Sequence, residues 1–201
     1  IIKQTLTIAW PSVLESFFFF LAGMMDTIMV SSLGAYAIAA VGLTQQPKFL
    51  GLALFLSMNV AVSAVVARRK GEGDREGANL VLRMALWVTI LLTVIISVVF
   101  VVFASPIVAL VGSQEDTHAY AVEYLQIIMG GIGFNTISLV LNAAQRGAGN
   151  TRIAMTTNLV SNVVNIVFNY LLIGGNFGFP ALGVRGAAIA TVLGTVCACV
   201  M

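Results

Sequence analysis

Long apolar stretches alternate with short groups of charged residues along this chain. Four stretches contain no Asp, Glu, Lys or Arg: residues 49–67, 84–114, 124–145 and 153–184. An α-helix crosses the hydrocarbon core of a bilayer in about 20 residues, so each stretch is long enough for a membrane span. With turn signals as boundaries, the pattern predicts six spans, near residues 5–31, 37–66, 80–104, 118–144, 153–174 and 184–201.

The spacing inside the spans favours helices over strands. Strands of a membrane barrel alternate apolar and polar residues, whereas the run LLTVII at residues 91–96 does not alternate. We therefore predict an all-α, polytopic membrane protein in which residues 1–201 form one transmembrane lobe. For the sixth span, only 16 residues follow from Gly186 to Met201. This is about 24 Å of helix, less than the thickness of the bilayer core, so we expect a fragment of a larger protein.

Composition agrees with a membrane protein and excludes several other classes. The chain is 59% hydrophobic and 9% charged, against about 45–50% and 25% in soluble domains, and its mean hydropathy is +1.01. These values exclude a typical cytosolic enzyme and a disordered regulator. The net charge of +2 is too small to indicate a nucleic-acid partner. With one His and two Cys, we expect neither a metal centre of those residues nor a cofactor.

The ten basic residues are divided unequally between the two sides of the six predicted spans. Eight fall on one side: Lys3, Arg68, Arg69, Lys70, Arg75, Arg83, Arg146 and Arg152. The other side receives Lys48 and Arg185. Because cytoplasmic loops carry the excess of Lys and Arg, we expect an integral protein of the plasma (inner) membrane with both termini of the lobe in the cytoplasm.

Two carboxylates lie inside the first predicted span. Glu15 and Asp26 are 11 residues apart, so they differ by about 20° around a helix and by about 16 Å along it. Charged groups at membrane depth are costly and usually belong to a transport pathway or to a partner. Glu15 could instead reach the cytoplasmic interface, and its role stays open. Pro11, one turn earlier, removes a backbone hydrogen bond and predicts a kink.

The fifth predicted span carries a stripe of four asparagines. Asn158, Asn162, Asn165 and Asn169 fall within about 60° of one another around a helix, while nearby positions off the stripe are apolar. A lone asparagine is typical of hydrogen bonding between helices. Four in register favour the wall of a hydrated cavity, although the first interpretation also remains available.

Two other spans carry weaker polar patterns. Asn135 and Asn142 recur on the fourth span, where packing and cavity lining are equally good interpretations, and Thr191 lies on the sixth span among small residues. Together these positions predict a polar chamber with one or two carboxylates. Such a carboxylate can bind and release a proton, hold a hard cation with the help of neighbouring oxygens, or attract an organic cation. A transporter can use the competition among these three.

Several runs of residues carry a resemblance to a known family. They are Pro11 with GMMDT at 23–27, AAVGL at 39–43, RGAGN at 146–150, and the segment 165–191 with GFPALGV at 178–184. In this order along the chain, they are similar to the motifs of the multidrug and toxic compound extrusion (MATE) family. The resemblance covers nearly the whole chain.

This resemblance implies a fold and a function. The chain would be the N-terminal six-helix lobe of a twelve-helix, two-lobed transporter. Members of the family are secondary antiporters that export organic cations in exchange for protons or sodium ions. The implied partners are therefore organic cations, membrane lipid, and a C-terminal lobe of the same protein or a second copy of the chain.

The family's coupling cluster has an Asp in span one, an Asn and an Asp in span five, and a Thr in span six. Asp26, Asn165, Asn169 and Thr191 match these positions, and Pro11 matches the kink. The span-five Asp is thus an Asn here, which leaves Asp26 as the only carboxylate. This departure weakens a sodium site at Asp26, Asn165 and Asn169 and favours proton coupling through Asp26. Other candidates for cavity lining are Glu15, Asn158, Asn162, Asn135 and Asn142.

Three other functions fit the pattern less well. A lipid-linked precursor flippase needs basic residues inside the chamber, and none of the ten Lys and Arg is expected at mid-span. An intramembrane enzyme needs a reactive pair at matched depth, and Glu15 and Asp26 are too far apart for that. A non-catalytic membrane scaffold would have no use for the polar stripes.

Overall fold

The computed structural model describes residues 2–201, and the side chains of 2–9, 11, 12, 15 and 19 lie outside that description. The elements are α1 (Ile2–Ser31), α2 (Ala35–Gly71), α3 (Arg75–Val102), α4 (Ala104–Leu110), α5 (Glu115–Gly130), α6 (Ile132–Gly147), α7 (Thr151–Gly174), the 3₁₀ turn η1 (Asn176–Gly178) and α8 (Val184–Val200). The prediction of an all-α protein is confirmed.

The helices begin and end close to the predicted spans. Each span corresponds to one helix, except residues 118–144, which α5 and α6 share. By length and composition, α2, α3 and α7 are the described helices able to cross a membrane, and the α5–α6 pair makes a fourth if it counts as one bent span. The described apolar part of α1, Ser16–Ser31, and α8 are shorter. Crossing by these two helices stays a prediction.

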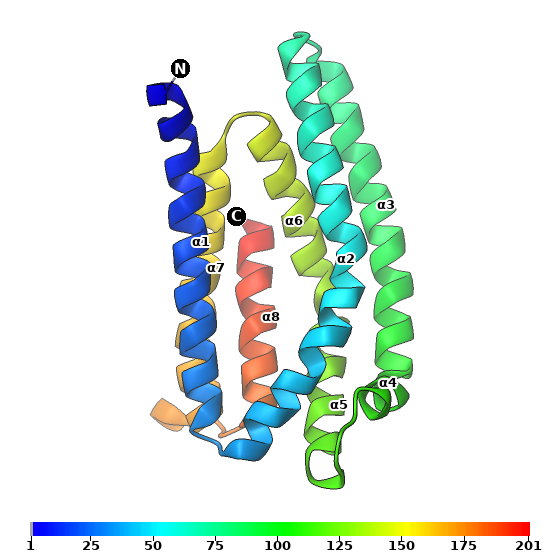
Figure 1. Ribbon diagram of the computed structural model, residues 1–201, viewed down its shortest axis with the longest axis vertical. Coiled ribbons are helices and arrows are strands. Elements are labelled where there is room, and N and C mark those ends of the chain that lie inside the picture. Colours follow the sequence, from blue (N-terminus) through cyan, green and yellow to red (C-terminus); the bar gives the residue numbers. More distant parts are fainter. Residues whose placement is uncertain (1) are drawn as a thin grey trace.

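The helices form two groups, which α8 joins. α1 and α7 lie side by side at one edge and α8 packs along α7, while α2 packs against α3, α5 and α6 at the other edge (Figure 1). α8 also contacts α5 and α6, so it is the central helix. The α2–α3 and α6–α7 loops lie at the end where the N-terminus lies, and the α1–α2 and α7–α8 loops lie at the opposite end (Figure 1).

Two bends interrupt the regular course of the helices. α2 changes direction in its first half (Figure 1), and Pro47, which has no backbone N–H to donate, lies inside this helix. α5 and α6 meet at an angle of 46°, at a pair of glycines that weakens the helix. A Cβ added at Gly131 would lie 2.6 Å from the Val192 side chain of α8. Glycine at this point therefore lets α8 pack into the bend.

Two other glycines permit close contacts between helices. A Cβ at Gly186 of α8 would lie 2.5 Å from the carbonyl oxygen of Leu172 in α7. One at Gly147 of α6 would lie 2.4 Å from the carbonyl oxygen of Ser63 in α2. Both distances are well inside van der Waals contact, so any larger residue would force the two backbones apart.

The outer surface of the helices is strongly apolar. On α3, Trp87, Leu91 and Val98 are 73%, 63% and 56% exposed. Monomeric soluble proteins rarely expose apolar patches of large extent, whereas lipid chains can cover them. The distribution of apolar side chains thus agrees with an integral membrane protein.

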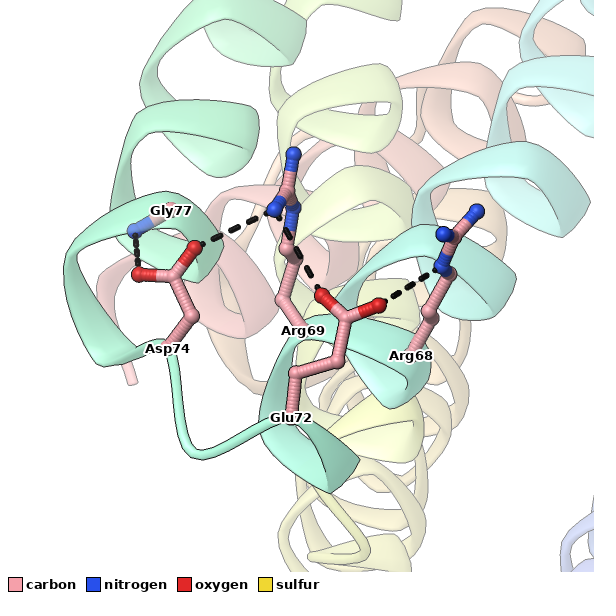
Figure 2. A network of polar contacts seen from close by, with 5 residues as sticks. All are labelled: Arg68, Arg69, Glu72, Asp74 and Gly77. Carbon is pink, nitrogen blue, oxygen red and sulfur yellow. Dashed lines mark hydrogen bonds and ion pairs between the residues drawn. The ribbon is translucent and has the colours of Figure 1, made fainter.

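Charged side chains hold the turn between α2 and α3. Asp74 caps α3 by accepting a hydrogen bond from the backbone N–H of Gly77 at 2.8 Å, and Arg69 lies 3.2 Å from its second oxygen (Figure 2). Glu72 pairs with Arg68 at 2.9 Å. Because these side chains are largely exposed, each ion pair contributes only about 0–1 kcal/mol. The cluster fixes a tight turn.

Candidate functional site

A cavity of about 690 Å³ lies between the two groups of helices. Side chains of α1, α2, α5, α6, α7 and α8 line it, and its volume falls within the range of sites for drug-sized molecules. Leu52, Ile128 and Leu139 belong to its apolar wall. The polar residues of the lining are Asp26, Thr27, Gln45, Lys48, Asn135, Asn142, Arg146, Asn158, Ser161, Asn162, Asn165, Thr191 and Thr195.

Asp26 is the acidic residue of the described lining. It lies near the end of α1, half-buried, where α1 packs against α7. The side-chain nitrogen Nδ2 of Asn169 donates to its carboxylate oxygen Oδ1 at 2.5 Å. Asn169 is fully buried, so the carboxylate is held against an amide of the protein interior on one side and faces the cavity on the other.

The same amide begins a chain of hydrogen bonds that reaches α8. Asn169 Nδ2 also donates to Asn165 Oδ1 at 3.2 Å, and Asn165 Nδ2 donates to the Thr191 hydroxyl at 3.1 Å. The Thr191 hydroxyl in turn donates to the carbonyl oxygen of Ala187 at 3.0 Å. The structure thus brings together the four residues that the sequence nominated for the coupling cluster, Asp26, Asn165, Asn169 and Thr191.

Tyr124 of α5 completes this network. It is 2% exposed, and its hydroxyl is hydrogen-bonded to Thr191. Because Thr191 gives its only proton to the Ala187 carbonyl, Tyr124 is the donor and Thr191 the acceptor. Four helices, α1, α5, α7 and α8, therefore meet in one directed network, in which the Asn169 amide nitrogen donates to both Asp26 and Asn165.

One buried atom of the cluster has no hydrogen-bond partner among the described residues, the side-chain oxygen Oδ1 of Asn169. Buried amide oxygens nearly always accept a hydrogen bond. Rotating this amide by half a turn would exchange its oxygen and nitrogen, and three oxygens would then converge, from Asp26, Asn165 and Asn169. The present orientation suits an ionised Asp26, and the rotated one suits a bound proton or sodium ion.

The asparagine stripe of α7 serves both purposes that the sequence left open. Asn158, Asn162 and Asn165 line the cavity. The side chain of Asn158 also accepts a hydrogen bond from Asn142 of α6 at 3.3 Å, and Asn165 and Asn169 bond to α8 and α1 as described above. An amide can hold a neighbouring helix with one group and present the other to the cavity, so the two interpretations do not compete.

The fourth predicted span contributes in the same way. Asn135 and Asn142 of α6 both line the cavity, and Asn142 is 5% exposed. Two further candidates, Glu15 and the kink at Pro11, concern side chains that lie outside the described part of α1.

Lys48 corrects one element of the sequence analysis. The expectation that no basic residue lies inside the chamber is wrong, because α2 continues through Pro47 and carries Lys48 into the cavity lining. The side of the membrane on which Lys48 lies stays a prediction. The signal was present in the sequence, since Lys48 lies inside the predicted span 37–66. The argument against a chamber with basic residues therefore fails.

Two other lining or network residues were missed. Arg146, assigned only to a cytoplasmic loop, is the last basic residue of α6, lines the cavity and donates to Asn59 of α2 at 3.3 Å. Tyr124 carried no sequence signal beyond being a tyrosine within an apolar span. Its contact with Thr191 joins residues of two helices that are distant in sequence.

Comparison with known proteins finds relatives of this chain. The family model MatE matches residues 11–171. The probable multidrug resistance protein NorM of Thermotoga maritima is 31% identical over 95% of this chain and 41% of its own length, and the multidrug resistance protein PmpM of Pseudomonas aeruginosa is 30% identical over 94% and 40%. The outward-facing structure of a multidrug resistance MATE family transporter superposes with a TM-score of 0.88, at 30% identity over 96% of this chain and 42% of that one.

The fraction of each relative that this chain covers indicates which part of the transporter it represents. The chain spans about two-fifths of the length of the relatives that it matches. It corresponds to one lobe of such a transporter, as predicted from the resemblance. The matched proteins are transporters rather than enzymes, which agrees with the expected absence of an enzymatic function.

Proposed function

Because the chain belongs to the MatE family, the multidrug and toxic compound extrusion transporters, we propose that it is the N-terminal lobe of a secondary antiporter. In this proposal the whole protein exports organic cations in exchange for protons, and Asp26 is the coupling residue. The observation that carries the proposal is the position of Asp26, which faces the cavity and bonds to Asn169 at 2.5 Å.

One carboxylate can couple two cations because it cannot neutralise both at once. An organic cation in the cavity is attracted by ionised Asp26, and a proton bound to Asp26 removes that attraction. Loading a proton from one side of the membrane then releases the drug on that side. The amide of Asn169 supports both states, since its nitrogen donates to the ionised carboxylate and its oxygen, after rotation, accepts from the protonated one.

The same residues decide between proton and sodium. A sodium ion needs several oxygen ligands, and the cluster offers one carboxylate with the amides of Asn165 and Asn169 and the hydroxyl of Thr191. The cluster holds one carboxylate rather than two, which favours the proton. The amide of Asn169 donates to ionised Asp26 in the observed arrangement, and its unpartnered oxygen Oδ1 would add an oxygen ligand after rotation, which makes sodium the alternative to test.

We propose further that the lobe lies in the plasma membrane with both termini in the cytoplasm. The support is the concentration of basic residues in the α2–α3 and α6–α7 loops, which lie at the same end of the molecule (Figure 1). A cysteine placed at Glu72, in a variant without Cys197 and Cys199, tests this orientation. It should react with a membrane-impermeant maleimide in inside-out vesicles and stay protected in intact cells.

A second lobe is needed to close the cavity, either the C-terminal lobe of the same protein or a second copy of the chain. Lys48 and Arg146 in the lining support the alternative of a flippase for lipid-linked precursors. The family match and the acidic residue at Asp26 favour export of smaller organic cations. A scaffold without transport leaves the cavity unexplained.

The decisive experiment uses the full-length protein in proteoliposomes, with export of a fluorescent organic cation driven by a pH gradient or by a sodium gradient. Asp26→Asn should abolish gradient-driven export while the protein still folds and inserts. Asp116→Asn, the same chemical change at an exposed position in the first turn of α5, should leave export unchanged. Undiminished export by Asp26→Asn under either gradient would refute the proposal.

A further inference from the structure

A second charged side chain, that of Lys48, lines the same cavity as Asp26. Lys48 belongs to the face of α2 that lines this space, together with Ile38, Val41, Gln45 and Leu52. These positions follow one another at three- or four-residue intervals, which is the spacing of one face of a helix. Lys48 therefore points into the cavity by the geometry of α2, and most of its neighbours on this face are apolar.

The charge of Lys48 has no neutralising partner in contact with it. Among the described side chains, the one interaction that involves Lys48 is the electrostatic attraction of Asp26, and neither a hydrogen bond nor an ion pair joins the two. Lys48 is half-buried. The other basic residue of the lining, Arg146, is bonded to Asn59. An ammonium group in such a wall is costly unless a ligand or a partner offsets the loss of water.

The cavity lining thus holds two opposite charges on two different helices, and neither a hydrogen bond nor an ion pair joins them. A purely cationic substrate would satisfy Asp26 and be repelled by Lys48. A substrate that carries both signs would place its cationic group against Asp26 and its acidic group against Lys48, and would replace the attraction between these two residues by two close contacts. Ile128 and Leu139 supply an apolar surface for the body of such a molecule.

We propose that Lys48 is an anion-binding subsite of this cavity, at which the carboxylate or phosphate group of an amphipathic zwitterion binds. This inference rests on the proposed transport function and deepens it at one residue. Lys48 acts as a specificity-determining residue, because it separates zwitterions from cations of the same shape. The charged groups that face the acidic moiety from the described lining are Lys48, Asp26 and Arg146.

Proton binding to Asp26 should weaken binding of the cationic group of the substrate and strengthen binding of its acidic group. When Asp26 is ionised, it attracts a cationic group and competes with an acidic group for Lys48. When Asp26 is protonated, it releases the cationic group, while the charge of Lys48 becomes fully available to the acidic group. The acidic group therefore binds more tightly to the Asp26→Asn variant than to the wild type, whereas a cation without an acidic group binds less tightly.

Equilibrium binding of two matched dyes to the full-length protein in detergent tests the proposal. Rhodamine 110 has a free carboxyl group, and rhodamine 123 is its methyl ester with the same cationic ring system. Fluorescence anisotropy gives the dissociation constant of each dye. Lys48→Gln should weaken binding of rhodamine 110 by about tenfold and leave rhodamine 123 unchanged or tighter, and Lys48→Arg should preserve binding of both. Arg83→Gln, the loss of an exposed basic residue of α3, should change neither.

The outcomes are separable from those of the transport proposal, because no gradient is applied. Equal weakening of both dyes by Lys48→Gln would indicate a structural role and overturn the inference, as would no change in either dye. Failure of rhodamine 110 to bind the wild-type protein overturns it as well. If the binding results hold and gradient-driven export is absent, the subsite stands and the transport proposal fails.

Discussion

The amide nitrogen of Asn169 lies 2.5 Å from the carboxylate oxygen of Asp26. This contact joins α7 to α1 at the wall of the cavity, and it pairs a charged residue that faces the cavity with a neutral residue that is fully buried. The second residue controls the chemistry of the first, because it is the nearest group that can donate to the carboxylate or accept from it. The identity of residue 169 should therefore set the ion that the transporter uses.

Asn169→Asp should strengthen the sodium dependence of export. The change brings two carboxylates to within hydrogen-bonding distance, so that either they share a proton or both are ionised with a metal cation between them. Two carboxylates with Asn165 and Thr191 also give a harder set of oxygen ligands. Export from proteoliposomes under a sodium gradient, measured with and without a pH gradient, gives the dependence on each ion.

The matched control for this change is Asn162→Asp. Asn162 lines the same cavity from the same helix, so the variant adds the same charge without a second carboxylate at Asp26. It should leave the preference between sodium and proton gradients as it was. Identical ion dependence in Asn169→Asp and the wild type would contradict the role assigned to residue 169.

Tyr124→Phe should reduce the export rate while the protein stays folded. The phenyl ring fills the same buried space, and the loss is one hydrogen bond to Thr191, which is worth about 1 kcal/mol. Thr191→Val should be more damaging, because it leaves the buried hydroxyl of Tyr124 and the amide nitrogen of Asn165 without this acceptor. The melting temperatures of the two purified variants and their rates of gradient-driven export show which change is more damaging. Equal stability and export in both variants would refute the directed network.

Local patterns in the sequence were sufficient to predict most of the helices and about half of the polar residues that line the cavity. The asparagine stripe of α7 follows from helical periodicity alone, and the position of Asp26 follows from the cost of a charge at membrane depth. Both features depend on residues within one helix. The sequence could therefore place Asp26 and the stripe on particular faces of α1 and α7.

The residues that were missed depend on how different helices meet. Tyr124 enters the network because α5 packs against α8, and nothing near Tyr124 in the sequence indicates Thr191 as its partner. Lys48 enters the cavity because α2 remains helical through Pro47, a residue that commonly ends or bends a helix. The break between α5 and α6 likewise depends on the packing of Val192 at Gly131.

Thr89→Val should stabilise the protein, and Thr93→Val should destabilise it. Both threonines are buried on α3, but the hydroxyl of Thr89 has no hydrogen-bond partner among the described residues, whereas that of Thr93 bonds to the Thr136 hydroxyl at 2.8 Å. Replacing an unsatisfied hydroxyl by a methyl group of the same shape removes a cost of about 1–3 kcal/mol. The Thr136 hydroxyl already donates to the carbonyl oxygen of Gly133 at 3.0 Å, so Thr93→Val leaves no donor unsatisfied and costs only the hydrogen bond that it removes, about 1 kcal/mol. Melting temperatures of the two variants in the same detergent should shift in opposite directions, and a shift of the same sign in both would contradict this assignment of partners.

Gly186→Ala should lower both stability and export. A Cβ at this position would lie 2.5 Å from the carbonyl oxygen of Leu172, and a backbone atom cannot rotate away as a side chain can. α8 must therefore move away from α7, and the hydrogen bond between Asn165 and Thr191 crosses that interface. Gly130→Ala is the control, because a Cβ there meets nothing within 4 Å, and it should be neutral or stabilise the helix by up to about 1 kcal/mol. If Gly186→Ala melts and transports like Gly130→Ala, close contact between α7 and α8 is not what positions Thr191 against the coupling cluster.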